Sequence, residues 1–133
     1  MDNNLIMLRQ ISDERGHLVV LEAGRDIPFS IKRSYYVFGM QGDQPRGFHA
    51  HKELQQVIVC VRGACNVLHD DGRDKTTIRL DAPDKGVYIG PMVWHEMHDF
   101  TPDCVFVSYA SDLYDEADYI RDYGEFMKVV NNG

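Results

Sequence analysis

The sequence of 133 residues has few cysteines and no long hydrophobic run. Its three cysteines, Cys60, Cys65 and Cys104, are an odd number with apolar neighbours, unlike the disulfide framework of a small secreted domain. We therefore expect free, buried thiols. The longest apolar stretches, such as Val57–Val61, hold about five residues, whereas a bilayer span needs roughly 20. This shortage excludes a membrane-spanning helix.

Positive charge is also scarce, because 14 Lys and Arg residues face 21 Asp and Glu residues and the formal net charge is -7. Nucleic acid requires a basic surface, so we expect no nucleic-acid partner. An anionic ligand must instead meet a local cluster of arginines. The first residues, Met1–Leu5, lack the basic region and long apolar run of a secretory signal, so we expect a cytoplasmic protein.

Length and composition favour one globular domain over residues 1–133, with 44% hydrophobic and 26% charged residues. From Leu18 to Ala110, short apolar runs rich in Val, Ile, Tyr and Phe alternate with Gly, Pro and Asp clusters, which indicates an all-β sandwich or barrel. The segment Asp70-Asp71-Gly72 predicts a hairpin turn. The expected strands are Leu18–Glu22, Tyr35–Gly39, Gln55–Val61, Ala64–His69, Lys75–Leu80, Gly86–Ile89, Trp94–His98 and Val105–Tyr109.

The last part of the chain has a different periodicity. Apolar side chains recur at spacings of three and four, and acidic residues precede them where negative charge complements a helix dipole. We expect a short C-terminal helix that packs on the barrel. Its predicted apolar face consists of Tyr119, Ile120, Tyr123, Phe126 and Met127.

The segment Gly47-Phe48-His49-Ala50-His51 carries the strongest chemical signal. In a strand, side chains two residues apart project from one face, so the two imidazoles both point into the barrel or both point out of it. With Gln55 or Gln56 and then Gly63 downstream, the segment resembles the first motif of the cupin barrels, where two histidines and a glutamate often hold a metal. A neutral amide replaces the carboxylate here, which weakens a divalent-metal site, so we expect no metal.

Four longer segments occur in a specific order: Arg33–Gly39, Arg46–His51, Trp94–Met97 and Tyr114–Arg121. Together they resemble the TDP-4-keto-6-deoxy-glucose 3,4-ketoisomerases over most of the chain. The resemblance implies a cupin-type jelly roll and a homodimer that exchanges strands. It also implies no metal, no organic cofactor, and a TDP-linked 4-keto-6-deoxyhexose as the substrate.

Moving a ketone from C4 to C3 requires a base at C3, an enediol or enediolate intermediate, and an acid at C4. Histidine suits both transfers because its ordinary pKa is about 6.5. The resemblance implies that His49 is the base at C3, that His51 shuttles or delivers the proton, and that Tyr35 hydrogen-bonds the C4 oxygen or helps to carry the proton. Tyr36 is expected on the other face of its strand. From the residues alone, the alternative role for Tyr35 is an aromatic that fills the core.

Four further residues are candidates for holding the substrate. Arg46 and Arg33 are expected to contact the diphosphate or sugar oxygens through planar, two-pronged hydrogen bonds. Arg15 and Gly16 resemble the pair found in the family members that form the galacto product. The alternative for this pair is a simple hairpin turn.

The remaining histidines divide into two groups. His95 is expected to contact the substrate, with a buried structural histidine as the alternative. His95 alternates with Met97, and His98 is expected on the opposite face of the strand with Glu96 and Trp94. His17 and His69 border predicted turns, so we expect both at the surface.

The expected activity is the conversion of TDP-4-keto-6-deoxy-D-glucose to TDP-3-keto-6-deoxy-D-galactose, which would supply an aminotransferase in surface-polysaccharide biosynthesis. One alternative is a nucleotide deoxysugar 3,5-epimerase, which shares the barrel and the kind of substrate. A metal-dependent cupin oxygenase is a second alternative, against which the missing carboxylate argues. The third is a sugar-binding or regulatory cupin without turnover, which would need the arginines and aromatics but not paired histidines.

Overall fold

The computed structural model describes residues 4–41 and 43–132. Over these residues the chain forms two five-stranded antiparallel sheets with strand orders β1-β9-β6-β11-β4 and β12-β5-β10-β7-β8, and a separate β2-β3 hairpin. The elements are β1 (Leu5–Met7), β2 (Arg9–Asp13), β3 (Gly16–Val20), β4 (Arg33–Val37), β5 (Arg46–His51), β6 (Gln56–Arg62), β7 (Cys65–Asp70), β8 (Lys75–Leu80), β9 (Lys85–Ile89), β10 (Trp94–His98), β11 (Val105–Ala110), a 3-10 turn (Glu116–Asp118), β12 (Tyr119–Ile120) and α1 (Tyr123–Asn132).

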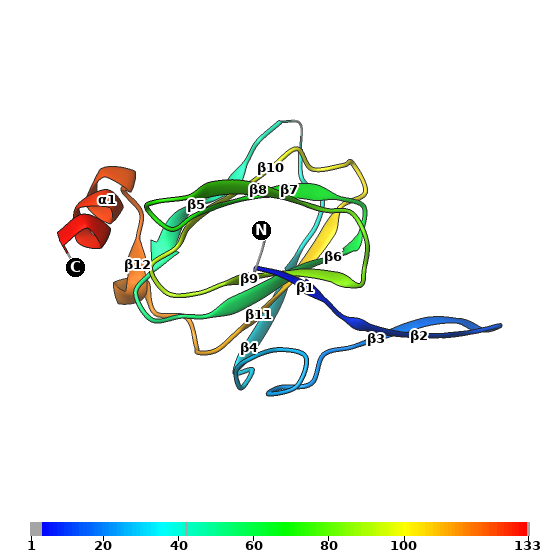
Figure 1. The fold of residues 1–133 in the computed structure, drawn as a ribbon. Coiled ribbons are helices and arrows are strands. Elements are labelled where there is room, and N and C mark those ends of the chain that lie inside the picture. The colour runs from blue at the N-terminus through cyan, green and yellow to red at the C-terminus, as the bar shows by residue number, and fades with distance from the viewer. Residues whose placement is uncertain (1–3, 42, 133) are drawn as a thin grey trace.

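The two large sheets face each other as a flattened barrel, with α1 on one side and the β2-β3 hairpin projecting away from the barrel on the other (Figure 1). This arrangement confirms the predicted all-β, cupin-type jelly roll. No helix in the described part of the chain is long and apolar enough to cross a membrane. The first three residues, on which the expectation about export partly rests, lie outside the described residues.

Strand β6 shows why one apolar run is continuous instead of alternating. Ile58 and Cys60 point into the barrel, whereas Val57 and Val59 point outward and are also buried. The outward pair is covered by the segment before β4, which contributes Ile27 and other apolar residues. A strand that is buried on both faces needs apolar side chains at every position.

All eight predicted strands are present, and no end differs from the prediction by more than two residues. The predicted hairpin is also present, since Asp70 of β7 pairs with Lys75 of β8 and Gly72 has a φ of 94. The prediction that His69 lies at the surface is wrong. His69 borders the turn but belongs to β7, from which its side chain points inward, so it is only 6% exposed. His17, by contrast, is exposed.

The predicted C-terminal helix is present but begins later than expected. Tyr119 and Ile120 form β12, which pairs with His51 and Ala50 of β5. Asp115 caps the start of the 3-10 turn that precedes β12, by accepting a hydrogen bond from the backbone N–H of Ala117 at 3.1 Å. The periodic apolar pattern therefore belongs to two elements, because strand pairing overrides the helical spacing at its start.

The three cysteines are free and buried, as predicted. Burial and the neighbouring Cys60 sulfur raise the pKa of Cys104 to about 12. A hydrogen bond with Cys65, together with burial, raises the pKa of Cys60 above its ordinary range. The thiols of Cys60 and Cys104 are therefore protonated at neutral pH and do not act as free thiolates.

Candidate active site

Three histidines meet inside the barrel. His49 and His51 project inward from β5, and His95 projects inward from the neighbouring strand β10, where it pairs directly with His49. The ring centroids lie 4.8 Å apart for His49 and His51, 4.6 Å for His49 and His95, and 5.6 Å for His51 and His95. We call this group the three-histidine cluster. The predicted shared face of the two β5 imidazoles is confirmed.

A β-bulge explains how Arg46 reaches the same face as His49. The two residues are three positions apart, a spacing that places side chains on opposite faces of a regular strand. Here Met97 pairs with Arg46 and His95 pairs with His49, so the intervening part of β5 contains one residue more than its partner strand. Phe48 is the extra residue, with a φ of 63. The bulge restores Arg46 to the interior face.

Gly47 makes this bulge possible. Its φ is 90, and a Cβ placed there would lie 3.0 Å from the carbonyl oxygen of His95 and 3.3 Å from the Cα of Glu96. The backbones of β5 and β10 thus approach too closely for a side chain. Glycine is the residue that tolerates both the positive φ and the close contact.

A cavity opens beside the cluster, between the two sheets. Its polar wall comprises His49, His95, Gln56, Arg46 and Tyr35, and its apolar wall comprises Val37, Gly47, Ile58, Met97 and Phe106. Tyr35 reaches this cavity from β4, the edge strand of the other sheet. Tyr36 points the other way, is 66% exposed and stacks on Phe38, as predicted. The barrel therefore brings a phenol and two imidazoles to one cavity from opposite sheets.

Burial keeps the cluster neutral. It lowers the pKa of His49 to about 4, against a smaller opposing effect of the hydrogen bond to the Gly47 carbonyl. Burial and the positive charge that His49 would carry lower the pKa of His51 to about 3. The fully enclosed His95 has its pKa lowered well below 6.5 for the same reasons. At neutral pH each ring can accept a proton without first losing one.

Hydrogen bonds determine which nitrogen of each ring is available. Nδ1 of His49 lies 3.1 Å from the Gly47 carbonyl oxygen, so in the neutral ring it donates there and leaves Nε2 as the acceptor. Nδ1 of His95 lies 3.3 Å from the Val93 carbonyl oxygen and has the same role. The Nε2 atom of His51 is buried without a hydrogen-bond partner among the described residues.

Gln56, not Gln55, is the amide that faces the cluster. Its Nε2 lies 3.1 Å from Nε2 of His95, and its Oε1 accepts a hydrogen bond from the hydroxyl of Ser108 at 3.0 Å. Gln55 points elsewhere and accepts a hydrogen bond from Tyr88 at 2.8 Å. The carbonyl of Gln56 is thus engaged, which disfavours it as a metal ligand. At this site, the three imidazoles are close enough to share one metal ion, because their ring nitrogens lie within 4.8 Å of one another.

Tyr119 is a site residue that the sequence reasoning assigned to a helix. From β12 its ring contacts both β5 histidines, with centroid distances of 4.9 Å to His49 and 4.5 Å to His51. The guanidinium of Arg121 lies over this ring at 4.2 Å and is held by two hydrogen bonds to Glu116, at 2.9 Å and 2.8 Å. The motif Tyr114–Arg121 already marked this segment in the sequence. Its residues alone did not predict that Tyr119 pairs with β5 in a strand.

Arg33 stands at the edge of the site, with its guanidinium carbon 5.6 Å from the Tyr35 ring and 5.8 Å from the Tyr114 ring. Its Nε atom is buried without a hydrogen-bond partner among the described residues. Arg15 and Gly16 lie elsewhere, in the turn of the projecting β2-β3 hairpin, where Arg15 pairs with Asp13. Within one chain, the structure does not bring this pair to the three-histidine cluster.

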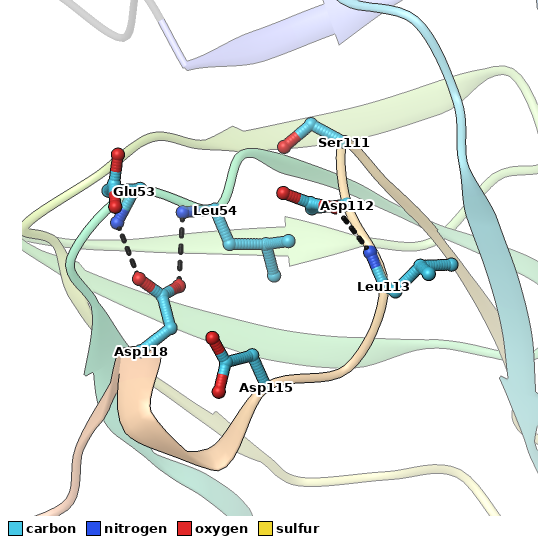
Figure 2. A pocket seen from close by; sticks show the side chains of 7 residues that line it. All are labelled: Glu53, Leu54, Ser111, Asp112, Leu113, Asp115 and Asp118. Carbon is cyan, nitrogen blue, oxygen red and sulfur yellow. Dashed lines mark hydrogen bonds between the residues drawn. The ribbon is translucent and has the colours of Figure 1, made fainter.

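The segment that follows His51 is held by Asp118. Its carboxylate accepts hydrogen bonds from the backbone N–H groups of Glu53 at 2.9 Å and Leu54 at 3.2 Å (Figure 2). These bonds border an acidic pocket that is separate from the histidine cavity. The pocket is lined by Glu53, Leu54, Ser111, Asp112, Leu113, Asp115 and Asp118. Its acidic lining does not suit an anionic ligand, whereas the histidine cavity has Arg46 in its wall.

Neutral imidazoles, a phenol and an arginine line one cavity inside a cupin-type jelly roll, and imidazoles and phenols are groups that can transfer protons. Comparison with known proteins agrees. Residues 1–131 match the family described as FdtA, WxcM-like, C-terminal. The chain belongs to this family, whose named relatives are sugar 3,4-ketoisomerases, a class of intramolecular oxidoreductases.

A curated relative from Aneurinibacillus thermoaerophilus, TDP-4-oxo-6-deoxy-alpha-D-glucose-3,4-oxoisomerase, is 55% identical over 98% of this chain and 94% of its own length. The crystal structure of a mutant 3,4-ketoisomerase from Thermoanaerobacterium thermosaccharolyticum, in complex with TDP-4-keto-6-deoxyglucose, is 42% identical. The match between the two structures covers 99% of this chain and 97% of the ketoisomerase chain, with a TM-score of 0.94. A 3'-monoepimerase from Streptomyces bikiniensis is only 22% identical, covers 86% of this chain and 66% of that chain, and has a TM-score of 0.74, which shows the shared fold alone.

Proposed function

We propose that residues 1–133 act as one cupin domain that converts TDP-4-keto-6-deoxy-D-glucose to TDP-3-keto-6-deoxy-D-galactose. The observation that carries the proposal is the neutral, inward-facing His49, which faces Tyr35 across one cavity and contacts the ring of His51 behind it. The names of the relatives support the nucleotide and the keto-sugar. The product would pass to an aminotransferase, because a 3-ketone is the group that such an enzyme converts to an amine.

In this mechanism His49 begins the reaction. Its Nε2 accepts the proton from C3 of the sugar, because its Nδ1–H is already committed to the Gly47 carbonyl. The electron pair of the broken C3–H bond forms the C3–C4 double bond of an enediolate, and the C4 oxygen becomes an anion. Tyr35 hydrogen-bonds that oxygen and stabilises its charge.

The second half of the reaction returns a proton to C4. His51 shuttles or delivers this proton to C4. The C3 hydroxyl loses its own proton and becomes the new ketone, and the C4 oxygen gains a proton in its place and becomes a hydroxyl. C3 thus loses one carbon-bound and one hydroxyl hydrogen and C4 gains one of each, so the sugar is neither oxidised nor reduced overall. No step uses a metal ion or an organic cofactor, so we expect a chelator to leave turnover unchanged.

Arg46 and Arg33 supply the positive charge for the substrate's diphosphate and sugar oxygens. Arg46 lines the cavity, and the buried Nε of Arg33 has no partner among the described residues. His95 contacts the sugar from the floor of the cavity. A buried donor without a partner is costly, so a bound oxygen atom at Arg33 would relieve that cost.

A homodimer completes the site. The β2-β3 hairpin projects from the barrel and exposes apolar side chains, with Ile11 60% and Leu18 56% exposed. A two-stranded hairpin is marginally stable alone, so a second copy is the partner that would cover it. Crossing to that copy would carry Arg15 and Gly16 toward its cavity, where they would influence which face of the enediolate receives the proton.

Mixing two inactive variants tests this exchange. His49→Asn disables the barrel, and Arg15→Glu disables the hairpin by placing a negative charge beside the enediolate. If hairpins cross, equal mixing with random subunit exchange restores about a quarter of wild-type activity, because half of the dimers contain one intact site. His49→Asn mixed with Tyr35→Phe is the matched control and restores nothing, since both defects lie in the barrel. No recovery with Arg15→Glu would refute the crossing.

The activity itself is tested with TDP-4-keto-6-deoxy-D-glucose in deuterated water, with the product analysed by NMR. Ketone migration gives a new constitutional isomer, whereas a 3,5-epimerase leaves the ketone at C4. His49→Asn should abolish turnover while nucleotide binding survives. His98→Asn is the control, because His98 lies on the outer face and pairs with Glu96 at 2.8 Å. Wild-type turnover by His49→Asn would show that the catalytic assignment is wrong and favour a binding role for the pair.

A further inference from the structure

A second cluster of candidate metal ligands lies in the barrel interior, away from the histidines. The Sγ atoms of Cys60 and Cys65 are 3.5 Å apart, and those of Cys60 and Cys104 are 3.7 Å apart. All three sulfurs lie within 4.8 Å of one another. We call this group the three-thiol cluster. It joins both sheets, because Cys60 ends the inward face of β6, Cys65 begins β7, and Cys104 precedes β11.

The cluster is separate from the proposed catalytic site. Along the inward face of β6, Gln56 contacts the histidines, Ile58 lies next, and Cys60 follows. Ile58 packs with Phe106 and Met97 in the apolar core between the two groups. The thiols themselves are at most 1% exposed. A ligand of the thiols would therefore not touch the substrate.

The sulfur geometry is suited to a soft metal ion. At a metal–sulfur distance of about 2.3 Å, three sulfurs in a trigonal plane lie about 4.0 Å apart, close to the observed separations. Thiolate sulfur selects soft ions such as Cu(I) over hard ones. Structural zinc requires four ligands, and in the described part of the chain no His, Asp or Glu belongs to this group.

We propose that the three-thiol cluster binds one Cu(I)-like, thiophilic metal ion through Cys60, Cys65 and Cys104, and that this ion ties the two sheets together at that end of the barrel. Each thiol that coordinates as a thiolate releases one proton to water, and the metal keeps its oxidation state. Access runs past Cys104, which directly follows the exposed residues Pro102 and Asp103. Local opening of such a surface loop costs less than global unfolding.

The test titrates Cu(I), without oxygen, into the reduced full-length protein in competition with a chromophoric Cu(I) chelator. We expect one Cu(I) for each chain and an X-ray absorption spectrum with three sulfur neighbours. Cys60→Ala and Cys104→Ala should each bind Cu(I) at least tenfold more weakly. Because a metal that binds only the folded state stabilises it, Cu(I) should raise the midpoint of thermal unfolding in the wild type but not in these variants.

His49→Asn is the control for the other candidate donor set and should retain full Cu(I) binding. Circular dichroism identifies any cysteine variant that does not fold, and Cys65→Ala then takes its place. The proposal is overturned by nitrogen neighbours in the absorption spectrum, by loss of copper in His49→Asn, or by cysteine variants that bind as tightly as the wild type. None of these outcomes depends on the ketoisomerase reaction.

Discussion

Replacement of Gly47 by alanine tests whether the bulge in β5 builds the active site. Alanine at a φ of 90 costs roughly 1–2 kcal/mol. The new Cβ would also lie 3.0 Å from a carbonyl oxygen of β10, and a backbone atom cannot move aside as a flexible side chain can. We expect a total loss of about 2–4 kcal/mol in the free energy of unfolding. Displacement of His49 and Arg46 should lower kcat/KM about 100-fold.

Gly24→Ala is the matched control. Gly24 has a φ of 81, but a Cβ placed there meets no atom within 4 Å. This variant should lose only about 1–2 kcal/mol and retain full activity. Urea unfolding measures the stabilities, and the NMR assay measures turnover. Equal losses of stability in the two variants, with wild-type turnover in Gly47→Ala, would refute the role of the bulge.

Three other predictions concern the same site. Folded His49 and His51 stay neutral while an unfolded histidine gains a proton below about pH 6.5, so stability is full above that pH and falls as the pH is lowered. By pH 5 the loss is about 2 kcal/mol for each of these two histidines, and His51→Asn should flatten the slope in urea titrations at several pH values. Tyr35→Phe should lower kcat at least tenfold, whereas Tyr36→Phe, on the exposed face, should leave kcat unchanged; similar kcat values would exclude a catalytic phenol. Asp118→Ala leaves two backbone N–H groups unpaired and should cost about 1–3 kcal/mol in urea unfolding, more than Asp115→Ala, and equal costs would contradict the bracing role.

Much of the fold followed from local patterns. Alternating apolar runs bounded by turn residues predicted the strands from Leu18 to Ala110, because side chains in a strand project alternately to its two faces. The same alternation predicted that His49 and His51 share a face. The resemblance of the longer motifs to the ketoisomerases indicated the family, which the comparisons confirmed.

Other features depended on contacts between distant segments. Alternation alone states that two side chains share a face, but not which face is interior or which partner they meet. Pairing of β5 with β10 brought His95 to the cluster and turned Arg46 inward through the bulge. Pairing of β12 with β5 placed Tyr119 against the histidines in place of a helix.

The sequence by itself therefore determined the strand pattern, the paired imidazoles and the three apolar-flanked thiols. Only the tertiary structure decided which groups come together: Gln56 in place of Gln55 at His95, and the sulfurs of three separate segments in one cluster. The physical reason is that local preferences act over a few residues, whereas strand register and sheet packing depend on residues far apart in the chain.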